Sequence, residues 1–175
     1  MPQDHPDIRA LRDRAAIQDV LTLYFQALDR GEPDLLRRCF TEDVVVWYDG
    51  RSALRSGGQD SSTGIAGLID SLVTFKRKRS GEWKVTTHFM GNLSIAIDGD
   101  AAETETYALA FIVLPGQPDQ VAMRSLRYLD RLRHTADGWR ICERQHTLDW
   151  SCQVPADFAV AMGQRQLARP GRALI

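Results

Sequence analysis

His88 is a candidate for acid–base chemistry because of the strand face on which it stands. Residues 84–97, KVTTHFMGNLSIAI, alternate with a period of two, and apolar side chains occupy most odd positions. From Thr86 to Ala96 the even positions carry His88, Asn92 and other mostly small or polar residues, but no Lys, Arg, Asp or Glu, which is unusual for a solvated face. An imidazole can exchange a proton near neutral pH. The alternative is a core histidine bonded to the backbone or to a Thr hydroxyl.

A second polar group is predicted on the last strand, near residues 138–150. Alternation places a basic pair between apolar side chains, which suits the wall of a pocket. The face predicted by strict alternation comprises Arg140, Cys142, Arg144, His146, Leu148 and Trp150. A salt bridge from Arg144 to Glu103, Glu105 or Glu143 is an equally plain interpretation.

The remaining elements must position these side chains. Apolar residues at helical spacing predict a first helix that ends at about Arg30, within the turn sequence DRGEPD. A short helix over 33–40, a strand over 43–50, a loop over 51–64 and an amphipathic helix over 64–79 follow. Four strands come next, near 84–98, 101–114, 120–134 and 138–150, and turn residues separate them. Helices followed by a meander predict an α+β fold with helices on one face of a curved sheet.

Composition limits the possible partners. The 175 residues fit one domain, with a net charge of −1 and 26% charged residues, so we expect no nucleic acid and no membrane partner. No signal peptide or membrane-spanning run is present in the sequence, which predicts a cytoplasmic protein. The three cysteines fit reduced thiols, and the four scattered histidines predict no metal site.

Two stretches resemble the SnoaL-like domains of the nuclear-transport-factor-2-like superfamily. They are AIQDVLTLYFQALDRGEPDLLRRCFTEDVVVWYDG and RYLDRLRHTADGWRICERQHTLDW. The resemblance implies a cone-shaped fold, in which three helices close a strongly bent, mostly antiparallel sheet. It predicts a single domain over residues 1–152, followed by a helix or tail over 153–175. One strand face would then line the cone, and His88 would point into it.

The closest functional pattern is similar to that of scytalone dehydratase, bile-acid dehydratase and hexachlorocyclohexane dehydrochlorinase, which pair a helix aspartate with a strand histidine. Asp29 and His88 match those positions. The carboxylate would hold one imidazole nitrogen as N–H and leave the other free as a base. Asp29 also lies near the negative end of its helix, where a carboxylate is disfavoured, so something must compensate for it. A cap on the adjacent turn is the alternative role.

The resemblance also implies residues that contact substrate. Tyr24 matches a tyrosine of the bile-acid enzyme, Tyr48 one that positions water in scytalone dehydratase, and Arg144 an arginine of the dehydrochlorinase pattern. A guanidinium there could stabilise an enolate or a leaving anion. The predicted substrate-binding residues are Tyr24, Tyr48, Asn92, Arg144, His146 and Trp150. One of the two tyrosines is expected to be only a core residue.

The sequence therefore predicts a cofactor-independent lyase or isomerase acting on a largely apolar steroid, terpenoid or aromatic polyketide. A non-catalytic binding or assembly module, a polyketide cyclase and a dioxygenase small subunit are the alternatives. Apolar residues Phe89, Leu93, Ile95 and Ile97 on one side of the sheet predict a homodimer or homotrimer.

Overall fold

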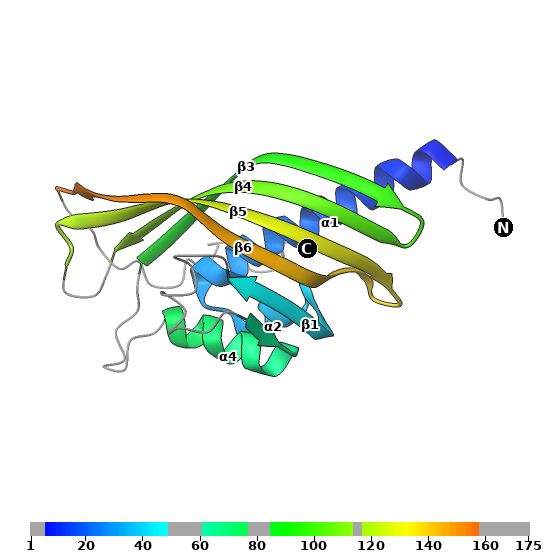
Figure 1. Cartoon of the computed structure of the whole chain (residues 1–175), viewed down its shortest axis with the longest axis horizontal. Helices are drawn as coiled ribbons and strands as arrows, with labels where there is room; N and C mark the ends of the chain where they lie inside the picture. The colour runs from blue at the N-terminus through cyan, green and yellow to red at the C-terminus, as the bar shows by residue number, and fades with distance from the viewer. Residues whose placement is uncertain (1–5, 49–60, 77–84, 114–116, 158–175) are drawn as a thin grey trace, which may run out of the picture.

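A computed structural model describes residues 6–48, 61–76, 85–113 and 117–157 (Figure 1). Within these residues, three helices, α1 (Pro6–Arg30), α2 (Pro33–Arg37) and α4 (Ile65–Lys76), accompany six strands. The strands are β1 (Phe40–Tyr48), β2 (Ser61–Thr63), β3 (Val85–Asp98), β4 (Ala101–Val113), β5 (Gln120–Thr135) and β6 (Gly138–Pro155). Residues 51–60 of the predicted loop, the basic end of the third helix and the tail beyond residue 157 lie outside the described residues.

The strands form one sheet in the order β2-β1-β6-β5-β4-β3. Neighbouring strands are antiparallel except β1 and β6, which are parallel. The predicted α+β class is confirmed. Three boundaries were wrong: β1 begins at Phe40, where a helix was predicted, β2 lies within the predicted loop, and β6 continues to Pro155. Short strands such as β2 form only by pairing with a neighbour, so local sequence carries little signal for them.

Register shifts change which side chains face inward. The pairing of β3 with β4 shifts between Met90 and Leu93, and that of β5 with β6 shifts at two places, Ser125/Leu126 and Arg131/Leu132. An extra residue moves all following side chains to the opposite face, bends the strand and increases its twist. The prediction of one uninterrupted face along each strand was therefore wrong.

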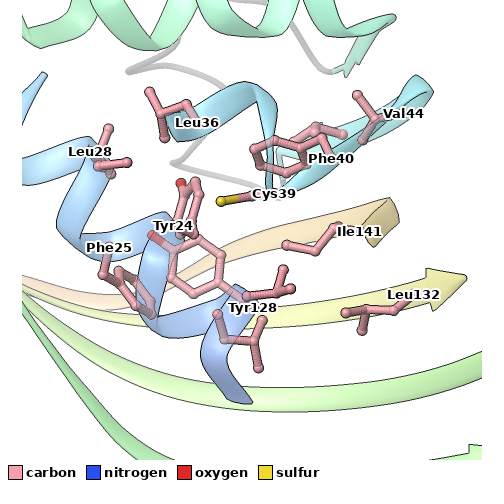
Figure 2. Packing of buried hydrophobic residues seen from close by; sticks show 14 of the residues in the cluster. Tyr24, Phe25, Leu28, Leu36, Cys39, Phe40, Val44, Tyr128, Leu132 and Ile141 are labelled. Carbon is pink, nitrogen blue, oxygen red and sulfur yellow. The ribbon is translucent and has the colours of Figure 1, made fainter. Parts of the chain in front are cut away.

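The main core lies between helix α1 and the inner face of the sheet. Helix α1 runs lengthwise over that face. Helices α2 and α4 and strand β1 lie below the four long strands in the view of Figure 1. Figure 2 shows side chains of α1, α2, β1, β5 and β6 that share this core, with Tyr24, Phe25 and Tyr128 close together. Ile17, Leu21, Leu36 and Ile141 are almost completely buried. Burial of this apolar area drives α1 onto the sheet and fixes the position of its last turn.

The outer face of the sheet is partly apolar but differs from the prediction. Leu93, Ile95 and Ile97 pack against the core, because the register shift turns them inward. Phe89 stays outside, 61% exposed. The other large apolar residues exposed on the described strands are Trp47, Tyr107, Leu109, Leu129 and Trp150. A groove of about 600 Å³ crosses this face between Trp47, Leu129, Arg131 and Glu143. Among the described helices, none is long and apolar enough to span a membrane.

Candidate active site

Asp29 and His88 form a short, well-defined pair between α1 and β3. Asp29 Oδ1 lies 2.6 Å from His88 Nδ1, the contact that the family resemblance implied. Oδ1 also accepts a hydrogen bond from the Thr86 hydroxyl at 2.8 Å, and Oδ2 accepts one from the backbone N–H of His88 at 2.8 Å. Three contacts therefore fix the carboxylate, and one of them fixes the imidazole.

This arrangement explains why a carboxylate is tolerated in the last turn of α1. Strand β3 is at the edge of the sheet, so some of its backbone N–H groups have no strand partner. The N–H of His88 points to α1 and donates to Asp29. Burial would raise the pKa of Asp29, but the hydrogen bonds and charge of His88, with the bond from Thr86, outweigh burial and lower the pKa below its usual value. These contacts supply the compensation that the helix terminus requires.

The His88 ring is buried, and its orientation is fixed. Its side chain is 4% exposed, and Phe25 of α1 stacks on the ring with centroids 5.6 Å apart. Because Nδ1 faces a carboxylate, the neutral ring holds its proton there and presents Nε2 as a base. Within the described segments, Nε2 makes no hydrogen bond. The arrangement can therefore orient an imidazole for proton abstraction.

Arg144 is occupied by a partner that the sequence interpretation missed. Its Nε and Nη2 each donate to Asp130 of β5 at 2.7 Å, and both side chains are buried. The guanidinium lies over the rings of Tyr24 and Tyr128, 4.1 and 4.5 Å from their centroids. The predicted partners Glu103, Glu105 and Glu143 were wrong: they lie on the outer face. Arg144 thus belongs to a buried ion pair within the wall of the site.

Tyr24 is a core residue. It is 4% exposed, and its ring makes edge contacts with Phe25, Phe40 and Tyr128. Burial raises the pKa of both Tyr24 and Tyr128, so both hydroxyls stay protonated. Tyr24 therefore supports Phe25, which in turn stacks on His88.

His146 and Tyr48 lie beside each other further along the inner face. Their ring centroids are 5.8 Å apart, and the His146 ring also contacts Tyr128 at 4.9 Å. Burial, together with the charge of Arg144, lowers the pKa of His146 to about 3. Burial raises the pKa of Tyr48 to about 12. Both groups are neutral at physiological pH.

Two predicted substrate contacts are not brought into this cluster. Asn92 is exposed within the irregular pairing that follows Met90. Trp150 is 49% exposed, because the shift between Ser125 and Leu126 interrupts the alternation after Leu148. Arg140 and Cys142 likewise leave the face of Arg144, because a second shift separates them. Strict alternation, applied across these shifts, caused all these errors.

Three residues that the site uses had been missed, although signals for them exist. Thr86 precedes His88 by two positions and shares its face. Phe25 precedes Asp29 by four positions, one helical turn earlier. Asp130 interrupts the apolar alternation of Leu126, Tyr128 and Leu132, which is the pattern of a buried carboxylate that needs a cation. In the described part of the chain, no group of three or more metal-binding side chains is present.

The comparisons with known proteins assign the family. The model of the SnoaL-like domain matches residues 9–145. The chain therefore belongs to the SnoaL-like family of the nuclear-transport-factor-2-like superfamily. Two uncharacterised proteins, Rv2910c of Mycobacterium tuberculosis and Mb2934c of Mycobacterium bovis, are each 32% identical over 140 residues, or 80% of this chain and 88% of the relative.

Solved structures share the fold at lower identity. A candidate scytalone dehydratase from Novosphingobium aromaticivorans is 19% identical with a TM-score of 0.69, covering 90% of this chain and 97% of its own. The hexachlorocyclohexane dehydrochlorinase LinA-type3 from Novosphingobium barchaimii is 17% identical with a TM-score of 0.68, covering 89% and 99%. These likenesses confirm the predicted cone fold with a curled, unclosed sheet.

Proposed function

We propose that this protein is a cofactor-independent lyase or isomerase that acts on a largely apolar small molecule by proton abstraction at His88. The observation that carries the proposal is the 2.6 Å contact between Asp29 Oδ1 and His88 Nδ1. It leaves Nε2 as the basic nitrogen of a buried ring that Phe25 holds from one side. General base catalysis needs aligned groups of this kind, whereas a non-catalytic module does not need them.

The proposed reaction needs only groups of this chain. His88 Nε2 takes a proton from a substrate carbon, and the C–H electron pair forms a carbon–carbon double bond. In elimination, a group on the neighbouring carbon leaves with its own bonding pair. In isomerisation, the π pair of an adjacent double bond shifts to another carbon and takes the proton back from His88 there. Asp29 stabilises the imidazolium that forms, as the carboxylate of an Asp–His pair does. That several solved relatives in fold are dehydratases or dehydrochlorinases by name supports this class of reaction.

The inner face also supports an apolar substrate. Phe25 of α1 stacks on His88, and the ring of Tyr128 of β5 packs against Phe25. Apolar walls supply most of the affinity in sites of this kind. We propose a steroid, terpenoid or aromatic polyketide as the substrate class.

The test is a panel of β-hydroxy ketones of these three types, incubated in D₂O. We expect the wild-type protein to exchange the acidic C–H or to release water from at least one member, as measured by mass spectrometry. His88→Ala should lose both signals. His134→Ala is the matched control, because His134 is an exposed histidine beside the β5–β6 turn. Equal exchange by His88→Ala and wild type would refute the proposed base.

A further inference from the structure

His146 is held in one orientation between two neighbouring strands. In the sheet register it lies opposite Tyr128 of β5 and Tyr48 of β1, and it contacts both rings. The imidazole of His146 therefore lies between two tyrosine rings on the inner face of the sheet. Tyr128 in turn contacts Phe25, the residue that stacks on His88, so a continuous set of rings joins the two histidines.

The hydrogen bonding of His146 differs from that of His88. Its Nδ1 is buried and has no hydrogen-bond partner within the described residues, whereas Nδ1 of His88 is held by Asp29. A buried N–H without an acceptor is costly, and here the nearest charges are cationic, which favours a lone pair at Nδ1. The proton of the ring then belongs on Nε2. Because the residue as a whole is only partly buried, its other edge can meet a ligand.

The surroundings keep this ring neutral. The positive charges that lower the pKa of His146 are those of Arg144 of β6, of His88 of β3 when protonated, and of Arg124 of β5. Tyr48 and Tyr128 are uncharged neighbours, and the carboxylate of Asp130 is held by Arg144. Burial and these charges are why the pKa of His146 is lowered to about 3. A neutral imidazole can donate a hydrogen bond to an oxygen without losing its proton to it, and cations nearby favour negative charge on that oxygen.

We propose that His146 is a second catalytic residue, whose Nε2–H donates to a substrate carbonyl oxygen as that oxygen becomes negative. This inference rests on the proposed function, and it specifies the substrate as a carbonyl compound with an acidic C–H beside the carbonyl. His88 Nε2 takes the proton, the C–H electron pair forms the C=C bond of an enolate, and the carbonyl π pair moves to the oxygen. The pair then returns as the β group departs or as another carbon is protonated.

The proposal is tested with 4-nitrophenol, whose phenolate imitates an enolate oxygen and absorbs visible light. The ionisation of the bound probe is titrated by absorbance with the protein in excess. We expect the wild-type protein to favour the bound phenolate by about tenfold, equivalent to a decrease of about one unit in the pKa of the probe. His146→Phe should abolish this preference, and His146→Gln, which keeps an N–H donor, should retain part of it. His134→Phe should behave as wild type.

Absence of binding by the wild-type protein, or an unchanged preference in His146→Phe, would overturn the proposal. A second measurement needs no variant: ¹⁵N NMR of the wild-type protein at about pH 5 should show His146 neutral with its proton on Nε2, and a cationic ring or a proton on Nδ1 would also overturn it. His88→Ala should keep the phenolate preference while losing C–H exchange. Persistence of exchange in that variant would refute the proposed base, whatever the probe shows for His146.

Discussion

Both faces of the sheet carry ion pairs between arginine and carboxylate side chains, but the pairs differ in burial and geometry. On the inner face, Arg144 and Asp130 form two hydrogen bonds of 2.7 Å, and both side chains are buried. On the outer face, Arg131 contacts Glu103 and Glu143 at 3.1 and 3.3 Å, and its side chain is 62% exposed. Water screens the outer cluster, so substitution of its members should change the free energy of unfolding only slightly. The inner pair has no such screening, and each member depends on the other.

The contrast explains where the candidate chemistry lies. Proton transfer needs a base whose orientation is fixed and whose charge is balanced by a defined partner. The inner face offers this at Asp29 and His88, with Phe25 and Thr86 as supports. The outer face offers exposed rings and charges, which are features of a surface that contacts another protein.

The largest expected effect is loss of stability when the inner ion pair is broken. Arg144→Met leaves Asp130 buried without its cation, and removal of one member of such a pair typically costs about 3–5 kcal/mol in the free energy of unfolding. Urea denaturation with far-UV circular dichroism measures it. Arg131→Met on the outer face should have a much smaller effect. Combining Arg144→Met with Asp130→Leu should restore much of the loss; equal destabilisation by the two single arginine variants would contradict the comparison.

The next effect concerns catalysis. His88→Ala should reduce turnover by at least about a hundredfold, the usual range for removal of a positioned base, and should leave binding of the apolar substrate intact. Asp29→Asn should also reduce turnover, because the ring loses its orienting acceptor and the charge that stabilises the imidazolium. The rate constant and the dissociation constant should be measured separately. A larger dissociation constant with an unchanged rate constant would mean that His88 contributes only to substrate binding.

A smaller effect concerns the pH dependence of stability. The pKa of His146 is about 3 in the folded protein, against about 6.5 for an unfolded histidine, so the unfolded chain binds more protons between these values. Stability from the neutral ring is therefore complete above pH 6.5 and decreases as the pH falls. Between pH 7 and pH 5 the decrease should be about 2 kcal/mol. His146→Gln should have a flatter profile in urea denaturation at these two pH values; parallel profiles would show that the ring is protonated in the folded state.

Substitutions on the outer face are expected to have the smallest effect on folding. We predict that they change the association of protein chains into oligomers instead. Trp47, Phe89 and Leu129 are exposed there, and a homodimer or homotrimer would cover them. Light scattering at micromolar concentration should show an oligomer, and Leu129→Lys should lower the measured mass with little change in unfolding. Ala66→Lys on the exposed side of α4 is the control. A wild-type monomer would refute this prediction.

The sequence determined the elements and the main candidate pair. Periodicity gave α1, α4 and the four long strands, because an amphipathic pattern is local and needs only one buried face. Asp29 and His88 could be paired in advance because the resemblance places them on two elements that meet. The cost of a carboxylate at the end of a helix also signalled a partner for Asp29.

Only the tertiary structure decided the register and the partners. The shifts after Met90 and beside Asp130 depend on how strands pair, and strict alternation cannot show where an extra residue is inserted. The shift after Met90 turns Ile95 inward, and the shift between Ser125 and Leu126 turns Trp150 outward. The pairing of Arg144 with Asp130, rather than with one of several glutamates, follows from the same register, which places the two residues opposite each other on adjacent strands. Contacts between distant positions have no local signature, and in this protein the burial of apolar area under α1 selects among them.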